Sequence, residues 1–304
     1  MDVFVRKFFA LGSDCTLHLA CDHEGLAEEA FAAAIQEIAR IEARYSRYRS
    51  DNLLSTINAV ALAGGYTTVD DETASLLDYA FACFRLSNGL FDVTSGLLRQ
   101  AWDFSSGRLP NPDVIEGLLP CIGLDKVTWR KPTLAFTCPG MELDFGGLGK
   151  EYAVDRATEI CQATGIRHGL VDLGGDIRMI GERHDGEPWS IGFRHPREPE
   201  DAVACVRLRY GALATSGDYE RFMEVDGVRY CHLLNPKTGW PAQGLASVSV
   251  IADTCLAAGS LATIAMLKGD GGAAWLNALG VRYLCVDDKG GWTASEAAGF
   301  RPSG

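Results

Sequence analysis

The chain has 304 residues, 47% hydrophobic and 22% charged, and these fractions are typical of a soluble globular protein rather than a disordered one. Its 40 acidic residues outnumber its 28 lysines and arginines, and the net charge of −12 disfavours binding to the phosphate backbone of nucleic acid. No apolar run approaches the ~18 residues needed to span a bilayer, so we expect no integral membrane segment.

The first fifteen residues, MDVFVRKFFALGSDC, mix charged and apolar side chains and contain no long apolar segment or small-residue cleavage site. We therefore expect no secretory signal and a cytoplasmic location. Ten cysteines are scattered without a C-x-x-C motif. We expect them to be mainly small buried hydrophobic residues, without a disulfide framework or a zinc site.

Four segments have apolar residues at helical spacing. In chain order they cover about 25–44, 71–87, 150–164 and 255–267. Asp70 is placed to begin the second helix, and Gly165 to end the third.

Nine segments have the β-branched or alternating composition of strands: CTLHLA, KVTWR, TLAFT, HGLVDLG, WSIGF, ACVRLRY, RFMEV, ASVSVIA and VRYLCV. Most of them come in hairpin-like clusters rather than alternating singly with helices. This favours an α+β fold with largely antiparallel sheet over a doubly wound fold. Residues 103–120 are predicted to form a surface loop or short insertion, and no linker divides the chain, so we expect a single domain over residues 1–304.

The segment LDFGGLGKEYAVDRA begins at Leu143 and joins a short apolar strand to a helix through a glycine-rich turn. Glycines allow close approach to the backbone, a helix N-terminus offers free N–H groups, and Lys150 adds a positive charge, so the turn suits a phosphate group. It is not a Walker A loop, because Asp144 and Glu151 occupy positions where that motif needs glycine and Ser or Thr. A tight strand-to-helix turn with a solvated lysine is the alternative.

Three other segments contain polar or glycine residues next to predicted strands. In GLVDLGGDI, Gly174 and Gly175 could let a ligand come close or simply form a turn. In LATSGDYER, the residues Thr215, Ser216 and Gly217 supply two hydroxyls and a flexible backbone. The segment FDVTSGLL is explained equally well by core packing with a capping Asp92.

His232 precedes the turn residues of HLLNPKTG and lies beside polar residues rather than in an apolar face. An imidazole with an ordinary pKa can act as a general base at neutral pH, although a structural role explains this histidine as well. The VDGV segment ahead of it is a hairpin signal.

The order of these motifs resembles the FAD:protein FMN transferases of the ApbE family. The resemblance runs from LGSDC through YSRYRSDNLLSTIN, FDVTSGLL, LDFGGLGKEYAVD, GLVDLGGDI and LATSGDYER to HLLNPKTGWP and SLATIAMLKG, or about 85% of the chain. It implies a T-fold-related α+β domain and an enzyme that splits the pyrophosphate of FAD. The FMN is attached by a phosphoester bond to a Thr or Ser of an acceptor protein, and AMP is released.

The resemblance also implies the site residues. Lys150 would face the diphosphate and His232 would deprotonate the acceptor hydroxyl. The FAD site would be lined by Leu11, Tyr48, Leu90, Phe91, Asp92, Asp144, Lys150, Gly174, Gly175, Thr215, Ser216, Gly217, Leu233 and Ala262.

A magnesium ion bridging the diphosphate is implied as well, held by the carbonyl of Gly147 and the hydroxyl of Thr263. The family has an aspartate ligand four residues before that threonine, where this chain has Gly259. Since Mg²⁺ relies on only one or two protein carboxylates, we expect a weakened metal site, for which the hydroxyl of Ser260 would compensate only in part. The alternative function is therefore a catalytically impaired FAD-binding protein or an FAD pyrophosphatase.

Overall fold

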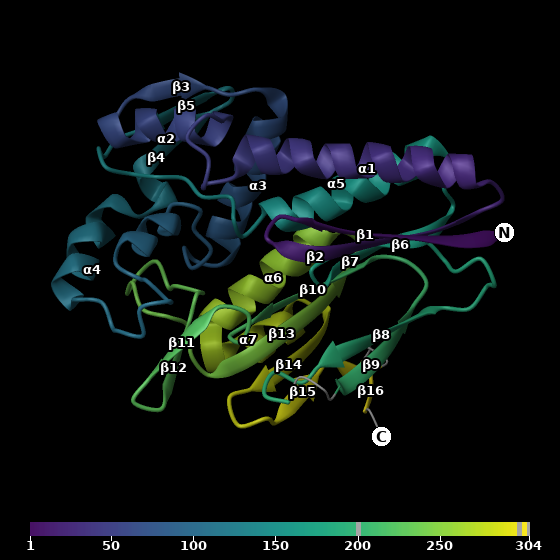
Figure 1. The fold of residues 1–304 in the computed structure, drawn as a ribbon. Coiled ribbons are helices and arrows are strands. Elements are labelled where there is room, and N and C mark those ends of the chain that lie inside the picture. Colours follow the sequence, from purple (N-terminus) through teal and green to yellow (C-terminus); the bar gives the residue numbers. More distant parts are fainter. Residues whose placement is uncertain (199–201, 297–299, 303–304) are drawn as a thin grey trace.

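The computed structural model describes residues 1–198, 202–296 and 300–302 (Figure 1). Its largest element is an eight-stranded sheet of order β1-β2-β6-β7-β10-β13-β14-β15, in which each neighbouring pair is antiparallel. The strands are β1 (Asp2–Ala10), β2 (Ser13–Cys21), β6 (His168–Leu173), β7 (Asp176–Gly181), β10 (Ala212–Gly217), β13 (Leu245–Ala252), β14 (Arg282–Asp287) and β15 (Trp292–Ala294). The predicted α+β fold with largely antiparallel sheet is confirmed.

Three long helices cover one face of this sheet (Figure 1). Helix α1 (Glu24–Tyr45) packs on α5 (Gly149–Thr164), which packs on β6 and β7, and α6 (Cys255–Lys268) packs on β10 and β13. Their apolar faces and the sheet form the main core, to which α1 contributes Phe31 and Ile38. The predicted end of α5 is confirmed, because Gly165 has the left-handed φ of 107°.

The opposite face of the large sheet is covered by a three-stranded sheet of β8 (Trp189–Arg194), β9 (Ala202–Leu208) and β16 (Arg301–Pro302). Phe193 and Val206 of this small sheet lie in one apolar cluster with Met179, Leu213 and Ile251 of the large sheet. Strands β7, β10 and β13 are therefore buried from both sides.

The remaining elements gather at one end of the molecule. They are α2 (Leu53–Ala63), α3 (Asp71–Leu86), α4 (Pro112–Leu118), the sheet of β3 (Tyr66–Thr68), β5 (Thr133–Phe136) and β4 (Val127–Arg130), and the hairpin of β11 (Phe222–Val225) and β12 (Val228–Cys231). Short 3-10 helices cover Ser95–Gln100, Leu119–Cys121, Leu124–Lys126 and Gly269–Gly271, and the last leads into α7 (Gly272–Ala278). The segment 103–120, predicted to be a loop, contains α4, which begins at an Asn111 cap followed by proline.

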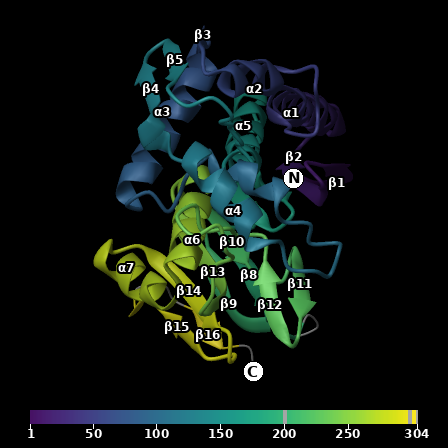
Figure 2. The same ribbon diagram turned by 90° about the vertical axis from the view of Figure 1, so that its left-hand side faces the viewer.

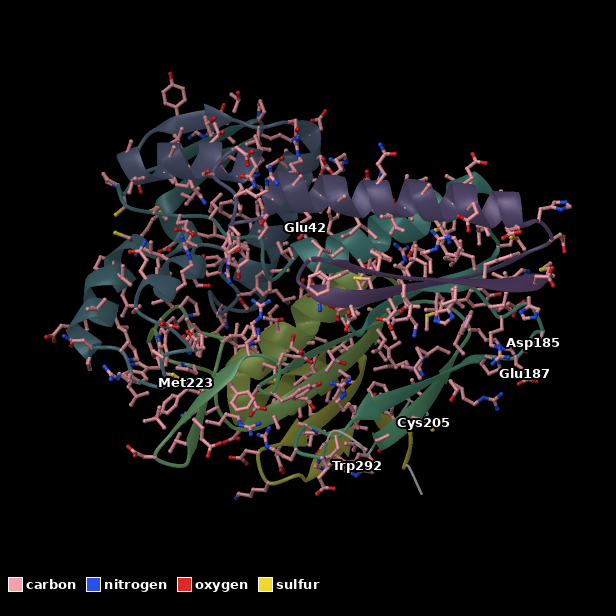
Figure 3. All side chains as sticks on the ribbon, viewed as in Figure 1. Glu42, Asp185, Glu187, Cys205, Met223 and Trp292 are labelled. Carbon is pink, nitrogen blue, oxygen red and sulfur yellow. The ribbon has the colours of Figure 1, made fainter. Side chains whose placement is uncertain are left out.

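A separate apolar cluster joins the hairpin to the α4 region, and the two lie next to each other in Figures 1 and 2. Trp102, Ile115 and Met223 are buried in it, and Met223 can be located on the hairpin in Figure 3. The indole N–H of Trp102 donates to the carbonyl of Gly239 at 2.8 Å. These contacts hold the chain on both sides of His232.

All ten cysteines are free. Seven of them are buried, which confirms the prediction that most are small buried hydrophobic residues. Among the described residues, no helix is long and apolar enough to cross a membrane.

Candidate functional site

A cavity of about 1420 Å³ lies where the β1–β2 turn, the C-terminal end of α1, the start of α5, the β6–β7 turn, β10 and the β11–β12 hairpin meet. Ligand sites commonly occupy about 300–1,000 Å³, so this space can hold a dinucleotide. The predicted site residues that line it are Leu11, Tyr48, Leu90, Phe91, Asp92, Asp144, Gly147, Lys150, Gly174, Gly175, Thr215, Ser216, Gly217, His232, Leu233 and Thr263.

Ala262 departs from this pattern. It has no exposed surface and packs in the main core, outside the cavity lining. Neighbouring residues of a helix point about 100° apart, so the face of α6 that brings Thr263 to the cavity turns Ala262 inward.

The glycine-rich turn is organised by Asp144. Its carboxylate accepts a hydrogen bond from the N–H of Gly146 at 2.8 Å and forms an ion pair with Arg47. Helix α5 starts directly afterwards at Gly149, and Leu148, its N-cap, gives no side-chain hydrogen bond. The positive end of the helix dipole therefore lies at the cavity wall, beside the guanidinium of Arg47.

Lys150 is paired across the cavity wall with Asp176, the first residue of β7. The ammonium lies 2.7 Å from the carboxylate, and Asp176 is 3% exposed. Burial would lower the pKa of Lys150, but the negative charges of Asp176 and Glu151 outweigh it, so this pKa is raised and the side chain stays charged. Gly174 and Gly175, both with positive φ, form the turn that brings Asp176 back toward Lys150.

His232 follows β12 and is half-buried. Burial, with the positive charges of Arg221, Arg47 and Lys150, lowers its pKa to about 4. Its Nδ1 lies 3.2 Å from the carbonyl oxygen of Arg221. Because a carbonyl oxygen only accepts, Nδ1 carries the proton and Nε2 keeps its lone pair.

Tyr48 stands at the cavity rim with 76% of its surface exposed. The Arg47 guanidinium lies 5.0 Å from its ring centroid and donates to its hydroxyl at 2.9 Å. This arrangement holds a flat aromatic surface against which a planar ring can stack.

The Phe91–Asp92 segment contributes mainly support. Phe91 is buried in the core at one edge of the cavity. The Asp92 carboxylate accepts from the N–H of Thr94 at 2.8 Å, from its hydroxyl at 2.7 Å and from the N–H of Leu124 at 3.1 Å. Both of its oxygens therefore hold the loop, as the capping interpretation of the sequence anticipates.

The Thr-Ser-Gly segment forms the end of β10 rather than a flexible loop. The hydroxyl of Thr215 is 2.7 Å from that of Ser249, and the hydroxyl of Ser216 is 2.8 Å from that of Thr263. The second contact joins the sheet to α6 at the predicted metal site.

Sequence reasoning did not identify Arg47, Arg221 or Glu151 as site residues, although all three line the cavity. The two arginines matter because, with Lys150, they bring positive charge to a cavity whose lining also includes several carboxylates. Arginine beside tyrosine in YSRYRSD and the arginine of SGDYER were the available signals. Among the described residues, no group of three or more His, Cys, Asp or Glu side chains could hold a metal ion by itself.

The sequence model of the ApbE family matches residues 11–285. Two similar curated proteins are the FAD:protein FMN transferases of Haemophilus influenzae and Vibrio cholerae. The first is 30% identical over 275 residues, covering 86% of this chain and 79% of the relative. The second is 33% identical over 234 residues, covering 74% of this chain and 69% of the relative.

Solved structures of ApbE proteins are also similar to this chain. The ApbE protein of Thermotoga maritima superposes with a TM-score of 0.89 at 32% identity, covering 97% of both chains. The flavin transferase ApbE of Vibrio cholerae superposes with a TM-score of 0.84 at 26% identity, covering 98% of this chain and 99% of that one.

Proposed function

This chain belongs to the ApbE family, and we propose that it is an FAD:protein FMN transferase. It splits the pyrophosphate of FAD, attaches FMN through a phosphoester bond to a Thr or Ser of an acceptor flavoprotein and releases AMP. The observation that carries the proposal is the convergence of Lys150, Arg47 and His232 on one cavity large enough for a dinucleotide.

The positive side chains of Lys150 and Arg47 and the N-terminus of α5 bind the diphosphate. A charge about 4 Å from a phosphate is worth about 4 kcal/mol at an effective dielectric constant of 20. Lys150 and Arg47 are each paired with a carboxylate, which fixes their positions and reduces this attraction. The pairing places them before the ligand arrives, so little side-chain entropy is lost on binding.

His232 supplies the base. Its unprotonated Nε2 takes the proton of the acceptor hydroxyl while that oxygen bonds to the FMN phosphorus. The bond from this phosphorus to the bridging oxygen breaks, and AMP leaves with the electron pair. The low pKa keeps the imidazole neutral at physiological pH, and the bound diphosphate will raise it toward neutrality by opposing the surrounding cations.

A magnesium ion, when bound, neutralises charge on the diphosphate. The oxygen donors expected to hold it, the carbonyl of Gly147 and the hydroxyl of Thr263, both belong to residues that line the cavity. Ser260 offers no third donor, because it is 1% exposed and its hydroxyl donates to the carbonyl of Leu256 at 2.8 Å.

The test is incubation of the full chain with FAD, Mg²⁺ and an acceptor carrying the Asp-Gly-x-Thr/Ser-Gly-Ala-Thr type of motif. We expect the acceptor to gain the mass of FMN less water, with one AMP released for each FMN attached. The matched control is an acceptor whose target hydroxyl residue is replaced by alanine. Release of AMP with free FMN and no mass gain would instead identify a pyrophosphatase, and intact bound FAD would identify a binding protein.

A further inference from the structure

Glu151, in the first turn of α5, is a buried carboxyl group that forms no ion pair of its own with any described residue. It is 7% exposed and lines the cavity. Within the described part of the chain, its Oε2 is buried and has no hydrogen-bond partner. The adjacent ammonium of Lys150 is already paired with Asp176 at 2.7 Å.

An unpaired buried carboxylate is costly, so its presence needs an explanation. With both carboxyl groups ionised, Glu151 and Asp176 would carry two negative charges against the single positive charge of Lys150. Burial raises the pKa of Glu151, and the neighbouring Asp176 carboxylate adds to this effect. A divalent cation bound at this point would balance the excess charge and occupy the free oxygen.

The position of the Glu151 side chain is tied to Gly259 on α6. A Cβ built on Gly259 would lie 2.5 Å from Cγ of Glu151 and 2.6 Å from its Oε1. The glutamate therefore fills the space in which a side chain at residue 259 would begin. A larger residue at 259 requires Glu151 to move.

Residue 259 is also where the ApbE resemblance places an aspartate ligand for the metal. Thr263 follows one helical turn later on the same face, about 6 Å along the α6 axis. Its hydroxyl lies 2.8 Å from that of Ser216, and it lines the same cavity as Glu151. Carboxylate, hydroxyl and carbonyl oxygens are the hard donors that Mg²⁺ prefers.

We propose that Glu151 supplies the carboxylate of the magnesium site, reaching from α5 into the space that Gly259 leaves open, together with Thr263 and Gly147. This inference rests on the proposed function for the identity of the metal. It replaces the weakened site expected from the sequence with a site whose acidic ligand comes from a different helix.

The test measures metal binding directly. Mn²⁺, detected by electron paramagnetic resonance, is titrated into the full chain, alone and with FAD. The Glu151→Gln variant keeps the shape of the side chain, and we expect its Mn²⁺ affinity to fall about tenfold or more. The matched control is Glu159→Gln on the same helix, whose half-exposed carboxylate lies outside the cavity lining and whose loss should leave Mn²⁺ affinity unchanged.

A swap of the two positions provides the second arm. Gly259→Asp alone should disturb the site, because its Cβ overlaps Glu151. The double variant Glu151→Gly/Gly259→Asp removes the overlap and returns the carboxylate to α6, so it should bind Mn²⁺ more tightly than Glu151→Gly. Thermal unfolding with and without Mn²⁺ checks that each variant is folded and reports the same order of affinities.

The inference is overturned if Glu151→Gln binds Mn²⁺ as the parent does, if the folded double variant gains nothing over Glu151→Gly, or if the parent binds no Mn²⁺. These outcomes are separable from failure of the proposed function. If the parent binds Mn²⁺ through Glu151 but never modifies an acceptor, the metal-site inference stands and the proposed transferase function fails. If the parent transfers FMN but Glu151→Gln binds Mn²⁺ as tightly as the parent, the proposed function stands and the metal-site inference fails.

Discussion

Replacing Asp155 by alanine should detach the start of α6 from α5 and lower the stability of the whole chain. The Asp155 carboxylate, on α5, accepts from the N–H of Cys255 at 2.8 Å and of Leu256 at 2.9 Å, which are the first two residues of α6. The same carboxylate pairs with Arg178 of β7 at 2.9 Å. One side chain thus joins two helices and the sheet, at the start of the helix that carries Thr263.

The size of the effect follows from these three contacts. Each buried N–H left without an acceptor costs about 1–3 kcal/mol, and breaking a buried ion pair costs about 3–5 kcal/mol. These terms overlap, because the N–H groups can find water at the helix end and Arg178 is 18% exposed. We expect a loss of about 3–4 kcal/mol for Asp155→Ala and about half of that for Asp155→Asn, which keeps one acceptor.

Urea and thermal unfolding, followed by circular dichroism, measure the loss. At roughly 2–3 °C for each kcal/mol in a chain of this size, Asp155→Ala should lower the unfolding midpoint by about 8 °C. Hydrogen exchange should speed up in the first turn of α6. The control is Glu159→Gln, because Glu159 lies 3.8 Å from the same arginine, is 48% exposed and should contribute less than about 1 kcal/mol.

The reasoning is refuted if Asp155→Ala unfolds within 1 °C of the parent, or if it loses no more than Glu159→Gln does. Unchanged hydrogen exchange in α6 would refute it equally, because the two N–H groups of that turn are the ones released.

Three further predictions concern the site, and a fourth concerns the packing around Gly239. The imidazole of His232, with a pKa of about 4, should titrate by NMR at a pH well below that of an ordinary histidine. Because folding lowers this pKa, the contribution of His232 to the free energy of unfolding is complete above pH ~6.5 and is lost as the pH falls toward 4. His232→Asn should retain FAD binding and slow transfer by about 10²–10⁴-fold in a flavin-transfer assay. Lys150→Met should weaken FAD binding, measured by flavin fluorescence, by about 30-fold, since roughly 2 kcal/mol of attraction remains after pairing with Asp176; equal affinity would rule out its contact with the diphosphate. Gly239→Ala should unfold at a lower temperature than the parent, because Gly239 has a φ of 73° and the added Cβ would lie 2.2 Å from Cγ2 of Ile115; an unchanged midpoint would contradict the close packing.

The helices were the elements best predicted from the sequence. Apolar residues at helical spacing predicted α1, α3, α5 and α6 to within one or two residues, although α6 is buried on most of its sides. The ends were marked by residues with local functions: the Asp70 side chain accepts from the N–H of Thr73, and Gly165 adopts the left-handed conformation. Such signals depend only on the nearest turn of chain.

Strands β7 and β10 were missed although they lie in the middle of the sheet. Their sequences, DIRMIG and ALATSG, are short and carry polar or glycine residues that face the cavity. Strand β10 pairs with β7 and β13, both distant in the chain, and β7 pairs with β10 as well as with its neighbour β6. The helix α2 was missed as well, and its cap at Asn52 was hidden among the arginines of YSRYRSDN. Strand preference of this kind is set by tertiary partners, which a local pattern does not contain.

The site was predictable where its function depends on backbone shape. The glycine turns before α5 and between β6 and β7 were identified from sequence because close approach requires glycine. Glu151 was not identified, since an acidic residue in the first turn of a helix is common for its favourable interaction with the helix dipole. Only the fold shows that this side chain turns inward and lies over Gly259.

The glycine at 259 and the glutamate at 151 therefore have to be considered together. From the sequence alone, glycine at position 259 means that α6 lacks the carboxylate expected there, which predicts an impaired metal site. In the folded structure, the same glycine leaves room for the Glu151 carboxylate of α5, because any side chain at 259 would begin within 2.6 Å of a Glu151 oxygen. A metal ion requires a ligand oxygen at the right position, and either helix can supply it. The absence of a ligand at one aligned position is thus weak evidence for lost function until the neighbouring helix has been examined for a replacement.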